Sequence, residues 1–190
     1  MIAATKTKYS ELIERVNQLV RAAGGRKVDE LALRRIEIEA KELLNVDGPG
    51  AFVVLGAVAC VKNDFTAMHA NHKHAIQIGG GAFACIQYSI SLNIVGMFTE
   101  SLEYAEKAHE IDPMDSRTIE NVIGALIQIG LKGRAKVYAE MWRKLNPDKE
   151  EYISDDEIDN FPGNIRPFVQ TAANKLLDKY KDVWAELARH

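Results

Sequence analysis

The chain has 190 residues, of which 47% are apolar, and its 24 basic and 27 acidic side chains give a formal net charge of −3. These are the proportions of a globular protein, and a domain of this size buries roughly 70% of its unfolded surface without needing a metal or a disulfide. The near-neutral balance argues against a general nucleic-acid binder and against a protein of anionic membrane surfaces. We therefore expect no nucleic acid and no membrane among its partners.

The cysteines and the first residues indicate the expected compartment. Cys60 and Cys85 each stand inside an apolar run, which is not the pattern of a secreted disulfide framework. Residues 1–9 contain Lys6 and Lys8 without an apolar segment behind them, so no signal peptide is expected. The cytoplasm is the expected location.

The elements predicted in chain order are all helices, because no long run alternates apolar and polar residues as a strand does. In the first helix Leu12, Val16 and Leu19 recur at helical spacing, and Gly24-Gly25 ends it. The predicted helices are 9–22, 28–45, 51–61, 64–78, 82–96, 98–111, 116–129, 132–145 and 164–188.

One stretch has the low charge of a membrane span, since residues 75–99 carry no charged side chain in 25 positions. A spanning helix needs about 20 uninterrupted apolar residues, whereas Gly79, Gly80 and Gly81 divide this stretch. We expect buried core helices here.

A repeat of 34 residues organises the second half of the chain. Gly96 and Gly130 are 34 apart, as are the pairs Asp112-Pro113 and Asn146-Pro147. Glycine allows the positive φ at which a first helix turns into a second, and proline ends the second helix. Small residues also recur at the same spacing, which lets the two helices approach closely: Ser101 with Ala135, and Ala105 with Ala139.

These residues resemble the tetratricopeptide repeat (TPR), and the resemblance covers about 48–147. A weaker unit lies upstream at a spacing of 33, in which Leu55 matches Tyr88 and Asn63 stands in place of the turn glycine. Trp142 replaces the small residue matched by Ala108, which predicts altered packing at the end of the array. The resemblance implies an array of helix pairs and a non-catalytic role in binding another protein.

The predicted fold is therefore an all-α, single-domain, right-handed array of antiparallel helix pairs with a C-terminal capping helix. Its expected parts are an N-terminal helix pair in 1–47, repeats in 48–147, an acidic linker in 148–163 and the capping helix in 164–190. Residues 148–159 hold seven acids and one lysine, so they are expected to be solvated, to dock a basic partner or to cap a short helix. The last helix carries an apolar stripe expected to pack on the helix at 132–145.

The sharpest chemical candidates are His69 and His72, which share a helix face and could hold one metal ion. No further ligands stand at metal-site spacing, so we expect neither a metal nor a cofactor, and no catalysis. Gly79-Gly80-Gly81 has no strand before it and no Gly-Lys-Ser/Thr after it, so a turn is favoured over a phosphate loop. Cys60 and Cys85 are expected to be buried and inert.

The expected binding surface follows from the low charge of residues 48–99, where only Lys62, Asp64 and Lys73 are formally charged. A groove formed by the helices of this region would receive an apolar segment of a partner, or it would be covered by the chain itself or by a second copy of the chain. The polar residues predicted to contact a partner are Gln87, Ser91, Asn93, Asn121 and Gln128.

The favoured function is that of an adaptor or chaperone-like holder of a protein or peptide segment, with a homodimer as a further possibility. The alternatives are an all-helical metal-dependent enzyme using His69 and His72, and a nucleic-acid-binding helical repeat.

Overall fold

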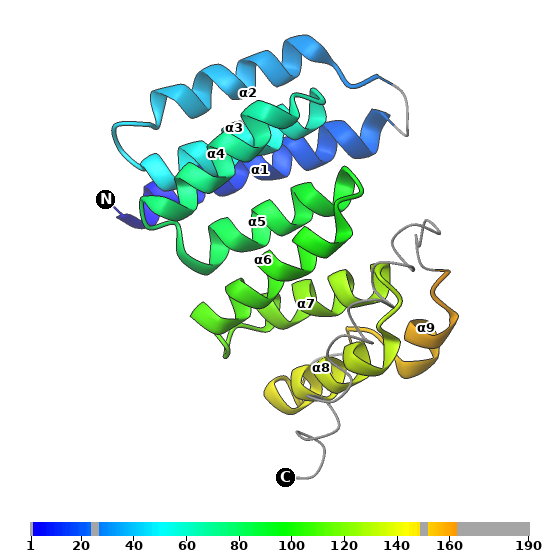
Figure 1. Ribbon diagram of the computed structural model, residues 1–190. Coiled ribbons are helices and arrows are strands. Elements are labelled where there is room, and N and C mark those ends of the chain that lie inside the picture. The colour runs from blue at the N-terminus through cyan, green and yellow to red at the C-terminus, as the bar shows by residue number, and fades with distance from the viewer. Residues whose placement is uncertain (1, 24–26, 149–151, 163–190) are drawn as a thin grey trace.

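Short helix-breaking segments separate the helices of this chain. They lie close to the positions that the spacing of the apolar residues predicts. The computed structural model describes residues 2–23, 27–148 and 152–162, and in these ranges every regular element is a helix. The helices are α1 (Ile2–Ala23), α2 (Glu30–Glu42), α3 (Gly48–Val61), α4 (Phe65–Gln77), α5 (Gly81–Ile94), α6 (Phe98–Ile111), α7 (Ser116–Gln128), α8 (Lys132–Leu145) and α9 (Asp155–Asn160) (Figure 1). The predicted all-α class is confirmed, while α1 begins seven residues earlier than expected.

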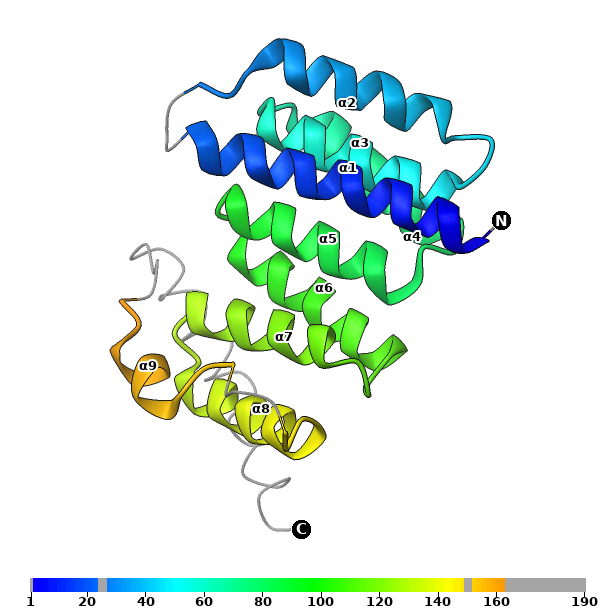
Figure 2. The ribbon, with the colours of Figure 1, turned by 180° about the vertical axis from the view of Figure 1, so that it is seen from behind.

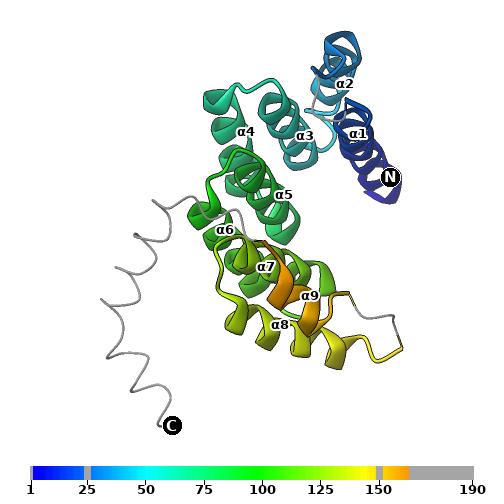
Figure 3. The same ribbon diagram turned by 90° about the vertical axis from the view of Figure 1, so that its right-hand side faces the viewer.

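The helices pack as successive pairs, α3 with α4, α5 with α6 and α7 with α8. In Figure 3, α4 and α6 lie on one side of the array, and α3, α5 and α7 lie on the other. Helix α1 packs against α3 on this second side, where the rings of Tyr9 and Phe83 are 5.1 Å apart and connect it to α5. Figure 2 shows α1 bordering this side at one end and α9 at the other.

The turns within the three pairs share one backbone conformation. Asn63, Gly96 and Gly130 have φ of 60°, 82° and 78°, so glycine or asparagine stands where the left-handed conformation is required. After the last two, the N–H groups of Met97 and Leu131 donate to carbonyls five residues earlier, each at 2.9 Å. These bonds form a Schellman motif, which satisfies carbonyls at the end of the first helix. The predicted turn positions of Gly96 and Gly130 are confirmed.

Small side chains fill the contacts between paired helices, as the repeat predicts. Ser101, Ala105, Ala135 and Ala139 are all buried. The predicted change at the array end is also present, because the Trp142 ring is buried where the preceding pair has Ala108. It packs 5.9 Å from the ring of Tyr152, in the segment that follows α8.

The acidic segment differs from the expected solvated linker, because it folds onto α8. Helix α9 lies within it, begins with a capping box between Ser154 and Glu157, and buries Ile158 completely. Asp159 pairs with Lys136 at 2.7 Å, and Asp155 pairs with Arg143 at 2.6 Å. Acids in the first turn of a helix also favour its N-terminus. The expected capping helix at 164–188 lies outside the described residues.

The least charged helices form the centre of the array. Helices α3 and α5 have 14 residues each, fewer than the roughly 20 that a bilayer requires. None of the helices in the described ranges has the length and apolar character needed to cross a membrane.

Candidate functional site

A groove of about 350 Å³ opens between α5 and α7, on the side of the array that α1 and α9 border. Helix α5 forms one wall and α7 the other, while Ser101 of α6 lies in the floor. Tyr152, which precedes α9, forms part of the rim. The residues that line the groove are Ile86, Ile90, Asn93, Ser101, Arg117, Glu120, Asn121, Gly124, Ala125 and Tyr152.

The space in the groove depends on a glycine inside α7. A Cβ atom added to Gly124 would meet no other atom within 4 Å. Glycine in a helix interior is about 1 kcal/mol less favourable than alanine, so this position lacks a side chain at some cost to the helix. On the α5 side of the groove, Ile90 remains 39% exposed although it belongs to an apolar helix. The groove therefore presents an apolar wall to a ligand.

Two asparagines give the groove its polar character. The amide oxygen of Asn93 and the amide nitrogen of Asn121 have almost no solvent contact and no hydrogen-bond partner among the described residues. The other amide atom of Asn121, Oδ1, lies 3.5 Å from the hydroxyl of Ser89. A buried polar atom without a partner costs about 1–3 kcal/mol. As whole side chains, Asn93 and Asn121 are half-buried and line the groove, so their amides are polar groups that a ligand there would meet.

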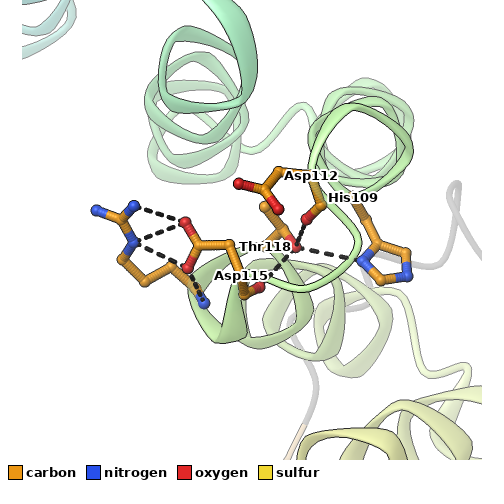
Figure 4. Close-up of polar contacts among 5 residues, drawn as sticks. His109, Asp112, Asp115 and Thr118 are labelled. Atoms are coloured by element: carbon orange, nitrogen blue, oxygen red, sulfur yellow. Dashed lines mark hydrogen bonds and ion pairs between the residues drawn. The ribbon is translucent and has the colours of Figure 1, made fainter. Parts of the chain in front are cut away.

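The charged residues on the α7 wall are held by contacts around them. Arg117 donates to Asp115 through Nε at 3.0 Å, and this hydrogen bond raises the pKa of the guanidinium. Figure 4 shows Asp115 at the start of α7 beside Thr118, whose hydroxyl lies 2.9 Å from the carbonyl of Asp112. One turn further on, Glu120 accepts a hydrogen bond of 2.8 Å from the indole of Trp142. Both charged side chains of this wall therefore have partners within the chain.

The histidine pair lies elsewhere, in a buried network between α4 and α5. His72 Nε2 is 2.9 Å from the hydroxyl of Ser91, and the His72 ring stacks on Tyr88 with centroids 5.1 Å apart. His69 Nδ1 lies 2.6 Å from the Tyr88 hydroxyl. Burial, with a smaller contribution from His69, lowers the pKa of His72 to about 3. His72 is therefore neutral near pH 7 and joins the two helices.

The structure separates the five residues predicted to contact a partner. Asn93 and Asn121 line the groove. Gln87 and Gln128 are half-buried and do not line it, while Ser91 is buried against His72 on another face of α5. Ser91 therefore has no access to a ligand in the groove.

Sequence reasoning missed the apolar wall and the space opposite it. Ile86 and Ile90 looked like ordinary core residues, because α5 is apolar around most of its circumference. Gly124 is the residue from which the groove could have been predicted. It stands inside a strongly periodic helix, where glycine usually has a packing or functional reason.

Three further candidates from the sequence are a metal site, the glycines at 79–81 and the two cysteines. In the described ranges, no group of three or more His, Cys, Asp and Glu side chains is placed to hold a metal ion. Gly79, with φ of 98°, lies in the turn between α4 and α5, and Gly81, with φ of 57°, is the first residue of α5. Cys60 and Cys85 are free and buried, and burial raises the pKa of both thiols.

Comparison of the sequence with protein-family models and with curated proteins found no match.

Proposed function

We propose that this protein is a non-catalytic binding module that holds a segment of a partner protein in the groove between α5 and α7. The observation that carries the proposal is the open space at Gly124, in a groove that Ile90, Asn93 and Asn121 also line. Apolar surface with a few fixed polar groups is the usual composition of a binding pocket.

The chemistry of the groove favours an extended peptide. Ile86 and Ile90 provide contact for an apolar side chain, and each buried side chain of that kind contributes about 1.5–3 kcal/mol. The half-buried side chains of Asn93 and Asn121 line the groove, and their amides can pair with the donor and the acceptor of a peptide group. An extended segment offers both at once, because its backbone is not paired with itself.

The repeat register supports the same role. The glycine turns and small interhelix residues resemble the tetratricopeptide repeat, and an adaptor or chaperone-like role is what that resemblance implies. Cytoplasmic binding is part of the proposal, since two free buried thiols suit a reducing compartment. The metal-dependent and nucleic-acid alternatives gain no support from the described residues, where His72 bonds to Ser91 and Arg117 pairs with Asp115.

A glycine substitution tests the proposal without disturbing the core. Gly124→Leu would fill the groove, and its Cβ meets nothing within 4 Å. Gly133→Leu is the matched control, because Gly133 is also in a helix, is equally open and lies outside the groove. A displayed library of random peptides should yield ligands for the unaltered protein, whose affinities are then measured by titration calorimetry.

Gly124→Leu should weaken peptide binding at least tenfold, and Gly133→Leu should leave it unchanged. Both variants should melt at or above the temperature of the parent, since leucine has the higher helix propensity. Peptide affinity that survives in Gly124→Leu, or a library that yields no ligand, would overturn the proposal.

A further inference from the structure

The outer face of α8 departs from the charged pattern of the preceding pair. At a spacing of 34 residues, Val137 takes the place of Glu103, and Met141 takes the place of Lys107. Glu103 and Lys107 are exposed on α6, as expected for a solvent-facing position. Val137 and Met141 are also exposed, at 58% and 37%, although they are apolar. Being four residues apart, they form a continuous apolar strip on one helix face.

Helix α9 does not cover this strip. It is held by Asp159 on Lys136 and by Asp155 on Arg143, two positions of α8 that are seven residues apart and share a face. At 100° per residue, Val137 and Met141 lie about 100–140° away from Lys136 around the helix. Trp142 faces inward to Glu120 and Tyr152, so it is not part of the strip either.

The chain itself carries an occupant of matching chemistry and sufficient length. Residues 163–190 number 28 and follow α9 after Phe161 and Pro162. Within them, one stripe of apolar residues recurs at helical spacing: Ile165, Phe168, Val169, Ala172, Leu176, Tyr180, Val183 and Leu187. A helix over 164–188 would be about 37 Å long, more than the roughly 21 Å of α8, so it is long enough to cover the whole strip.

Position and charge favour the same occupant. Asp159 is bound to Lys132 and Lys136 in the first part of α8, so the chain leaves α9 beside the N-terminal end of that helix. Three to five extended residues span about 10–17 Å, enough to pass around a helix end. Residues 163–190 hold five Lys and Arg against three Asp and Glu. The outer side of α6 is acidic on balance, with Glu100, Glu103 and Glu110 exposed against one exposed lysine, Lys107.

We propose that residues 164–188 form an amphipathic helix whose apolar stripe docks on Val137 and Met141 and caps the array. This proposal does not depend on the groove between α5 and α7. A short amphipathic helix is only marginally stable alone, so docking and helix formation are coupled. Hydrogen exchange of the amides in 164–188 therefore reports the docking directly.

The test uses the full chain and a double substitution, Val137→Glu with Met141→Glu. The matched control is Leu31→Glu with Ile38→Glu, which changes two exposed apolar residues on α2. Amides in 164–188 should be protected in the parent and in the control, and should exchange at least tenfold faster in the α8 variant. The milder pair Val137→Ala and Met141→Ala keeps a good helix former at both positions and should give a smaller increase.

Three outcomes would overturn the proposal. The first is a 164–188 segment that exchanges freely in the parent. The second is protection of that segment that none of the α8 variants changes. In the third, light scattering shows a dimer that the α8 substitutions convert to a monomer, which would assign the strip to a second copy.

Discussion

Ser89 and Ser101 exchange hydrogen bonds across the contact between α5 and α6. Ser89 Oγ donates to the Ser101 carbonyl, and Ser101 Oγ donates to the Ser89 carbonyl, each at 2.8 Å. Both residues are buried, and each hydroxyl joins the backbone of the other helix. Ser101 also lies in the floor of the groove, and Ser89 lies next to Asn121. The reciprocal pair therefore joins α5, one wall of the groove, to α6, whose Ser101 also lines the groove.

Replacing Ser101 with alanine should lower the free energy of unfolding by about 1 kcal/mol, the usual net contribution of one hydrogen bond. No cavity of consequence is expected, since Ala135 occupies the equivalent position in the next pair. Urea denaturation measures the change. Thr99→Ala removes an exposed hydroxyl from the same helix, so it should lower the free energy of unfolding by less. Equal losses in the two variants would contradict the role given to the serine pair.

Ala105→Leu and Ala139→Leu should each lower the free energy of unfolding by about 1–3 kcal/mol, because added methylenes must enter a closely packed contact. Both alanines are almost completely buried between paired helices. Ala70 of α4 is exposed and provides the control, so Ala70→Leu should leave the denaturation midpoint nearly unchanged. If the two core variants melt like the parent, these helices are not in the tight contact described.

Gly96→Ala and Gly130→Ala should each lower the free energy of unfolding by about 1–2 kcal/mol, the cost of the left-handed conformation for a residue with Cβ. Space is not the cause at Gly96, since a Cβ there meets nothing within 4 Å. Asn63→Gly should be neutral or stabilising, because the φ of Asn63 is 60°. Thermal melts of the three variants check the signs, and a stabilised Gly96→Ala would contradict the backbone argument.

Stability should fall as the pH drops below about 6.5 because of His72. The unfolded chain binds a proton at this histidine near its ordinary pKa of 6.5, whereas the folded chain does so only near the lowered pKa of about 3. Between these values the unfolded state binds more protons, so the free energy of unfolding decreases by about 1.4 kcal/mol per pH unit. Above pH 6.5 the residue is neutral in both states and contributes no slope.

Urea titrations between pH 4.5 and 7.5 measure this dependence. His72→Gln keeps a polar group for Ser91 and cannot titrate, so its slope should be smaller by up to about 1.4 kcal/mol per pH unit. His74→Gln is the control, because His74 is exposed and lies two residues away on α4. Identical slopes in His72→Gln and the parent would show that His72 is not a buried neutral group.

Much of the fold was predictable because its signals are local. Glycine at 96 and 130 stands where positive φ is required, and asparagine at 63 accepts the same conformation with a small penalty. Alanine at 105 and 139 occupies the close helix contacts. These choices depend on neighbours a few residues away, so the sequence by itself determines the helices, their turns and the register of their repeat.

The orientation of individual side chains required the tertiary structure. Helix α5 is apolar on nearly every face, so its pattern does not show that Ser91 faces His72 while Asn93 faces the groove. The acids of α9 likewise appear solvated until Asp155 and Asp159 meet Arg143 and Lys136 of α8. The groove itself joins residues of α5 and α7 that are about thirty positions apart. Such surfaces arise from packing between helices, and helical periodicity carries no information about which two faces will meet.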